Sequence, residues 1–83
     1  MATILVIDDQ KPIRALLRLV LEGAGHDVLE ASNGRLGLEL YQQRSADLII
    51  TDIVMPEMDG LETAQLIRRR GRSSRTPILF LKA

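Results

Sequence analysis

The chain has 83 residues, of which 46% are hydrophobic and 27% charged, with equal numbers of acidic and basic residues. This composition is typical of one soluble globular domain and excludes a disordered chain. The absence of cysteine excludes disulfides and thiolate metal sites, and no apolar run approaches the roughly 20 residues that span a bilayer. Because no basic stretch followed by a long apolar segment stands at the amino terminus, we expect no secretory signal and a cytoplasmic location.

Charge is distributed unevenly along the chain. Residues 1–67 carry all eleven acidic residues and five basic ones, whereas residues 68–83 carry six basic residues and no acidic one. The basic segment lacks the interleaved aromatic residues and the recognition helix of a nucleic-acid-binding surface. We therefore favour a solvated helix end, where cations interact favourably with the helix dipole, over a nucleic-acid-binding patch.

The first predicted elements are a strand and an amphipathic helix. Residues 3–7 form an apolar run with β-branched members, which is too short for a helix and typical of a buried parallel strand. Pro12 suits the first turn of a helix that ends at Gly23 or Gly25. The apolar residues of this helix follow the spacing i, i+3, i+4, i+7 and i+8: Ile13, Leu16, Leu17, Val20 and Leu21.

A second strand and helix follow. Residues 26–31 form a short strand, and the turn at residues 32–34 can cap a helix that reaches about residue 44. We expect Leu38 and Tyr41 to lie on the inward face of this helix.

The remaining sequence predicts a third strand, a loop, a third helix and a fourth strand. Residues 47–51 are the third strand, and residues 53–60 form a loop with Met-Pro and Asp-Gly pairs. Pro56 and Gly60 shape this loop, and we expect Gly60 to allow a backbone conformation that other residues resist. The third helix reaches about residue 70, and its apolar positions are Leu61, Ala64 and Ile67. Residues 77–81 are the fourth strand. The order βαβαβαβ predicts a doubly wound α/β fold, with a parallel sheet and helices on both faces.

Acidic residues follow two of the predicted strands. Asp8 and Asp9 end the first strand, and Asp52 ends the third. The carboxyl ends of neighbouring parallel strands meet at the edge where open α/β sheets bind ligands. Because Mg²⁺ prefers oxygen ligands, Asp9, Asp52 and the backbone carbonyl of Val54 are its candidate ligands, with Asp8 acting through a bridging water. The alternative, that the acids merely end strands in solvent, accounts less well for three of them.

Two segments resemble the receiver domains of two-component response regulators, the chemotaxis response regulator among them. Residues 4–9, ILVIDD, resemble the first strand and acidic pair of that family. Residues 48–60, LIITDIVMPEMDG, resemble its third strand, its phosphoacceptor aspartate and the loop that follows. The resemblance covers the whole chain and implies a flavodoxin-like sheet with strand order 2-1-3-4.

The resemblance also implies a reaction. Asp52 would accept a phosphoryl group from the phosphohistidine of a sensor histidine kinase or a phosphotransfer protein, with Mg²⁺ bound by Asp9, Asp52 and the carbonyl of Val54 and with Asp8 in support. A carboxylate is already ionised at neutral pH, so its attack on phosphorus needs no separate general base. Any catalysis would be limited to self-phosphorylation and slow autodephosphorylation.

The end of the chain departs from the family pattern. A complete receiver has five strands and five helices, so we expect residues 1–83 to form a partial, C-terminally shortened domain. Lys82 stands where the family has Ser or Thr. Three interpretations stay open: Lys82 contacts the carboxylates or the phosphate in place of that hydroxyl, it corresponds to the family's lysine after strand five, or it contacts nothing at a frayed terminus.

The expected strand order leaves the fourth strand at an edge of the sheet. Unpaired backbone groups and apolar side chains at residues 78–81 would face solvent, so we expect a homodimer through this edge. Three classes of function remain open: a phosphoacceptor signalling module, a receiver that binds partners without phosphorylation, and a structural fragment that only assembles.

Overall fold

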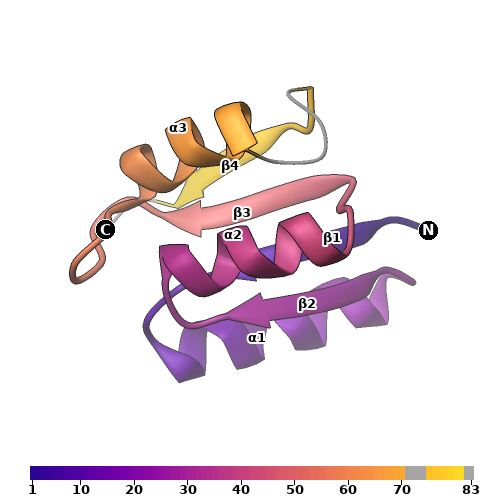
Figure 1. Cartoon of the computed structure of the whole chain (residues 1–83). Helices are drawn as coiled ribbons and strands as arrows, with labels where there is room; N and C mark the ends of the chain where they lie inside the picture. Colours follow the sequence, from indigo (N-terminus) through magenta and orange to yellow (C-terminus); the bar gives the residue numbers. More distant parts are fainter. Residues whose placement is uncertain (71–74, 82–83) are drawn as a thin grey trace.

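The computed structural model describes residues 1–70 and 75–81, which form a four-stranded parallel sheet with helices on both faces (Figure 1). Strand order is β2-β1-β3-β4, and every neighbouring pair is parallel. The predicted doubly wound α/β fold and its strand order are therefore confirmed. In chain order the elements are β1 (Thr3–Ile7), α1 (Lys11–Gly23), β2 (Asp27–Ala31), α2 (Gly34–Gln43), β3 (Leu48–Asp52), α3 (Gly60–Arg70) and β4 (Ile78–Leu81).

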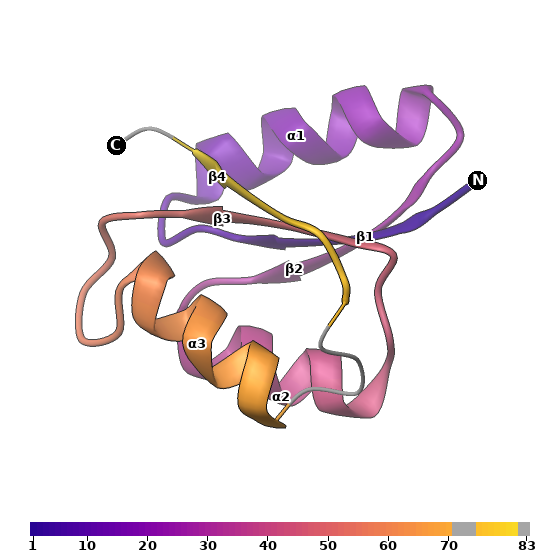
Figure 2. The same cartoon turned by 90° about the horizontal axis from the view of Figure 1, so that it is seen from above.

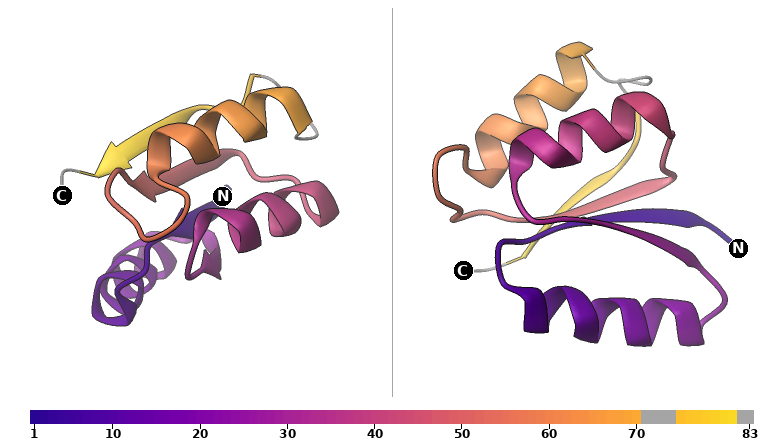
Figure 3. Two further views of the ribbon diagram at one scale, coloured as in Figure 1. Left: turned by 60° about the vertical axis from the view of Figure 1, so that its left-hand side comes forward. Right: turned by 60° about the horizontal axis from the view of Figure 1, so that its bottom comes forward.

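The helices divide between the two faces of the sheet. Helix α1 covers one face, and helices α2 and α3 lie side by side on the other (Figures 2 and 3). Because side chains alternate across a strand, Ile4 and Val6 of β1 face α1, whereas Leu5 and Ile7 face α2 and α3. Among the described residues no helix is long and apolar enough to cross a membrane.

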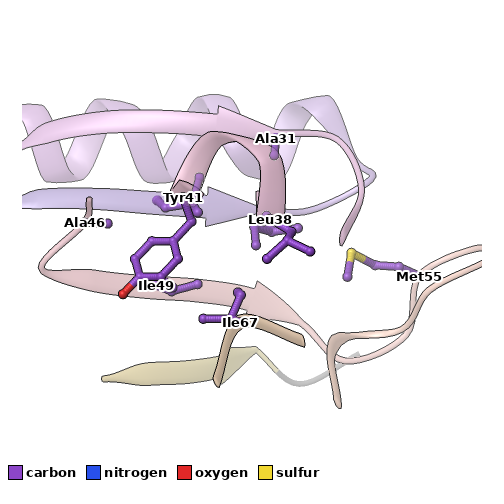
Figure 4. Packing of buried hydrophobic residues seen from close by; sticks show 9 residues of the cluster. Ala31, Leu38, Tyr41, Ala46, Ile49, Met55 and Ile67 are labelled. Carbon is purple, nitrogen blue, oxygen red and sulfur yellow. The ribbon is translucent and has the colours of Figure 1, made fainter. Parts of the chain in front are cut away.

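The larger apolar cluster lies between the sheet and the pair α2 and α3 (Figure 4). Leu38 and Tyr41 of α2 are buried in it, as predicted. The Tyr41 hydroxyl forms a hydrogen bond with the hydroxyl of Thr76, and the Thr76 hydroxyl also donates to the backbone carbonyl of Ala46. These bonds connect helix α2 to the segment that leads into β4, and they give the buried Tyr41 hydroxyl a hydrogen-bond partner in the core.

The ends of α1 and α2 follow the expected capping chemistry. The Asn33 side chain accepts a hydrogen bond of 2.8 Å from the backbone N–H of Leu36, which caps the amino end of α2. Helix α1 ends at Gly23, and Gly25 takes a left-handed conformation with φ of 91°.

Helix α1 is less buried than its apolar spacing predicts. Leu17 and Leu21 pack against the smaller cluster on the sheet, but no residue of α1 is buried. Leu16 is 56% exposed, and Val20 is also exposed. The reason is that α1 is the sole helix of the described residues on its face, so no neighbouring helix covers Leu16 and Val20.

The apolar positions of helix α3 are buried only in part. Thr63 and Ile67 are its buried side chains, whereas Leu61 is exposed. The Thr63 hydroxyl donates at 2.8 Å to the backbone carbonyl of Asp59, the residue before α3, and this local hydrogen bond permits its burial. Arg68, Arg69 and Arg70 form the exposed last turn of α3, the helix end that the basic segment predicts.

Candidate metal centre

Three carboxylates meet at the carboxyl edge of the sheet. Asp52 is the last residue of β3, and Asp8 and Asp9 directly follow β1, its neighbour in the sheet. The register pairs Ile7 with Thr51, which places Asp8 and Asp52 at adjacent strand ends. One carboxylate oxygen of each acid lies within 4.8 Å of the others. The structure therefore brings together the three acids that the sequence singled out.

Asp8 is the buried member of this cluster, with 2% of its surface exposed. Burial raises its pKa above the ordinary value, and the charges of Asp52 and Asp9 act in the same direction. The backbone N–H of Gln10, which donates to the Asp8 carboxylate at 2.8 Å, and the charge of Arg14 oppose this rise in the pKa. The three acids thus form a concentration of negative charge whose repulsion a cation would relieve.

An open pocket of about 730 Å³ lies above the carboxylates. Asp8, Asp9, Asp52 and Val54 contribute to its polar end, while its apolar wall comes from α1, the loop after β3 and the end of β4: Ile13, Leu16, Leu17, Met55, Pro56 and Leu81. Val54 is exposed on the rim, and the role of its carbonyl as a ligand stays a prediction. Lys82 lies outside the described residues.

Position 60 requires glycine because there is no room for a Cβ atom, not because the backbone takes an unusual conformation. A Cβ atom at this position would lie 2.0 Å from the backbone carbonyl oxygen of Asp52. The N–H of Gly60 also donates to the carbonyl of Ile53 at 2.8 Å, which closes the loop after β3. The left-handed residue of this loop is Glu57, with φ of 67°, so the conformational interpretation of Gly60 is wrong. A close backbone approach excludes a side chain here.

Sequence reasoning missed Arg14. Its Nη1 donates to the backbone carbonyl of Asp8 at 2.7 Å, and its Nε donates to the Glu30 carboxylate at 3.1 Å. An arginine one turn into the helix that follows an acidic pair is the signal that could have indicated this contact.

The whole described site lies within a segment that matches a known family. Residues 4–83 match the response regulator receiver domain. The chain is 48% identical over 80 residues to the transcriptional regulatory protein YrkP of Bacillus subtilis, covering 96% of this chain and 33% of that protein. The curated relatives that it matches are longer, and the chain spans 6% to 34% of their lengths.

Solved structures agree in fold over nearly all of the chain. The chemotaxis protein CheY4 of Vibrio cholerae superposes with a TM-score of 0.92 at 38% identity, covering 96% of this chain and 67% of that chain. The response regulator TrrA of Thermotoga maritima, solved in complex with Mg²⁺ and BeF, superposes with a TM-score of 0.89 at 38% identity. That match covers 100% of this chain and 70% of the Thermotoga chain. The protein therefore belongs to the family of two-component response regulator receiver domains.

Proposed function

We propose that the chain is a phosphoacceptor module, in which Asp52 receives a phosphoryl group in a Mg²⁺-dependent reaction. The observation that carries this proposal is the approach of three carboxylates to within 4.8 Å of one another, at the carboxyl edge of β1 and β3. The complex of the related TrrA with Mg²⁺ and BeF supports it. The donor in the cell would be a sensor histidine kinase or a phosphotransfer protein in the cytoplasm.

The residues present fit a hard divalent cation. All three side chains offer carboxylate oxygens, and no basic side chain among the described residues lines this pocket. Asp9, Asp52 and the carbonyl of Val54 would hold Mg²⁺, with Asp8 in support through a water. When bound, the ion would neutralise charge that develops on the phosphoryl oxygens.

The reaction itself needs little from the protein beyond placement. A carboxylate oxygen of Asp52 attacks the phosphorus, a new P–O bond forms, and the P–N bond of the donor phosphohistidine breaks. The electron pair of that bond leaves with the imidazole nitrogen, so an acyl phosphate remains on Asp52. The Asp52 carboxylate accepts a hydrogen bond of 2.9 Å from the backbone N–H of Ile53, which orients it.

Asp52→Asn tests the proposal directly. We expect the wild-type protein, incubated with Mg²⁺ and acetyl phosphate, to gain the mass of one phosphoryl group, and the variant to gain none. A suitable control is Asp59→Asn, since Asp59 lies in the same loop, is exposed and caps α3, a role that Asn performs equally well. Phosphorylation of Asp52→Asn, or its absence in the wild type while the control folds normally, would contradict the proposal.

A second candidate function is assembly without phosphorylation, which the exposed edge of β4 favours. Within the described residues β4 pairs only with β3, and Leu79 and Phe80 are 55% and 41% exposed. We propose that β4 pairs antiparallel with β4 of a second copy. This arrangement would pair the backbone groups that β4 leaves unpaired among the described residues and would cover Leu79 and Phe80.

Analytical ultracentrifugation measures this assembly. We expect a dimer at micromolar concentration that Leu79→Lys converts to a monomer. The control is Leu19→Lys, because Leu19 is exposed on α1 rather than on β4. A stable folded wild-type monomer under these conditions would exclude the dimer.

A further inference from the structure

We propose that Arg14 is a positioning residue of the acidic site: it holds the turn that carries Asp8 and Asp9 and so sets how the carboxylates meet. This inference rests on the proposed Mg²⁺ site, but it concerns a side chain that offers no metal ligand. Arg14 lies in the first turns of α1, and its side chain is only 15% exposed.

The contact reaches both acids through one peptide group. Arg14 donates to the backbone carbonyl of Asp8, and this carbonyl shares a planar peptide unit with the N–H of Asp9. Holding that oxygen therefore restrains the orientation of the whole unit and the directions in which both side chains leave it. The carboxylate of Asp8 is restrained further by the N–H of Gln10.

Arg14 is itself held in place by β2. Its Nε donates to one carboxylate oxygen of Glu30, and Arg18 donates to the other oxygen at 2.5 Å. The hydrogen bond from Arg18, aided by the one from Arg14, lowers the pKa of Glu30, so this anchor stays ionised at neutral pH. Arg18 also donates to Glu22 and to the carbonyl of Val28.

Arg18 thus provides a matched control. Both arginines bind Glu30 and both extend from α1, but only the bonds of Arg14 include the carbonyl of Asp8. Replacing either residue with Met keeps most of the aliphatic stem and removes one positive charge.

Electrostatics and positioning predict opposite outcomes for Arg14→Met. Removing a positive charge close to three carboxylates would by itself strengthen the binding of a cation. Losing the bond that orients the Asp8 peptide would weaken it, because outer partners of metal ligands typically contribute about 10-fold to 100-fold in affinity. The sign of the change in Mg²⁺ affinity therefore separates the two roles.

Calorimetric titration with Mg²⁺ at neutral pH makes this comparison. We expect Arg14→Met to bind Mg²⁺ about 10-fold more weakly than the wild type. Arg14→Lys should also bind more weakly, since one ammonium group cannot reproduce the two-sided guanidinium contact. Arg18→Met should stay close to the wild type. Equal or tighter binding by Arg14→Met would overturn the proposal.

A second measurement keeps this test independent of the Mg²⁺ site. If the wild type binds no Mg²⁺, the proposed function fails and amide hydrogen exchange at Gln10 decides the role of Arg14. We expect faster exchange of this amide in Arg14→Met, because the Asp8 carboxylate that accepts its bond loses its fixed backbone, and unchanged exchange in Arg18→Met. Unchanged exchange in both variants would then reject the positioning role. If Arg14→Met does not fold, Glu30→Gln, which weakens the anchor of Arg14, replaces it in the exchange measurement, where the loss of a negative charge does not decide the outcome.

Discussion

Gly60→Ala is expected to lower the free energy of unfolding by about 3 kcal/mol. The added Cβ would lie 2.0 Å from the carbonyl oxygen of Asp52, 2.9 Å from its carbonyl carbon and 3.0 Å from the Cα of Ile53. These are backbone atoms, which cannot rotate away as a side chain can, so either α3 or the end of β3 must shift. Urea denaturation followed by circular dichroism measures the loss.

The same displacement would move Asp52 away from Asp8 and Asp9, so we expect Gly60→Ala to bind Mg²⁺ more weakly as well. The control is Gly23→Ala at the end of α1, where an added Cβ meets no atom within 4 Å. This change should stabilise the protein by about 0.5 kcal/mol, because alanine reduces the entropy of the unfolded chain. A Gly60→Ala protein as stable as the wild type would show that the loop can rearrange, and our account of Gly60 would be wrong.

Asp8→Asn is expected to stabilise the protein without Mg²⁺ by about 1 kcal/mol while greatly weakening Mg²⁺ binding. The carboxylate of Asp8 is buried beside Asp9 and Asp52, which raises its pKa and makes its charge unfavourable in the folded state. The amide oxygen of Asn can still accept the bond from the N–H of Gln10. For a chain of this length, 1 kcal/mol corresponds to a rise in Tm of about 4–8 °C.

The stability difference between Asp8→Asn and the wild type should depend on pH in a direction set by the raised pKa of Asp8. Because the folded pKa of Asp8 is raised, the folded state binds the proton more tightly than the unfolded state does. The destabilisation by the charge is therefore absent below the ordinary pKa of 3.8 and develops as the pH rises through the raised folded value. The stability advantage of Asp8→Asn should therefore shrink as the pH falls from the raised folded pKa toward 3.8 and be absent below that value.

Thermal melts of both proteins across this pH range, with chelator present, measure the effect. Asp27→Asn is the control, since Asp27 is exposed at the start of β2, and its stability should match the wild type within about 0.5 kcal/mol. A destabilised Asp8→Asn at neutral pH would contradict the argument. With saturating Mg²⁺ the wild type should become more stable than Asp8→Asn, because the ion stabilises only the protein that binds it.

The sequence alone determined the fold class and the place of the acids. Apolar runs such as residues 3–7 and 48–51 are local signals, and right-handed crossovers between parallel strands leave few ways to arrange them. Once β1 and β3 are neighbours, the residues that follow them must meet at one edge of the sheet. The resemblance to receiver domains supplied the strand order, and the proximity of Asp8 and Asp52 followed from that order without knowledge of any side-chain contact.

The tertiary structure decided what depends on contacts between distant segments. Helical periodicity leaves the rotation of α3 open, and packing against α2, where Thr63 lies beside Gly34, selected Thr63 rather than Leu61 for burial. The spacing of α1 could not show that Leu16 would stay exposed, because exposure depends on which other elements cover the same face of the sheet.

Gly60 and Arg14 both support the acidic site through contacts that arise from tertiary packing. Gly60 excludes a side chain because the carbonyl of Asp52 lies against it, and Arg14 joins Asp8 to Glu30 across the first crossover. Neither contact is encoded in a local pattern, because each depends on the distance between elements that only the packed sheet and helices define.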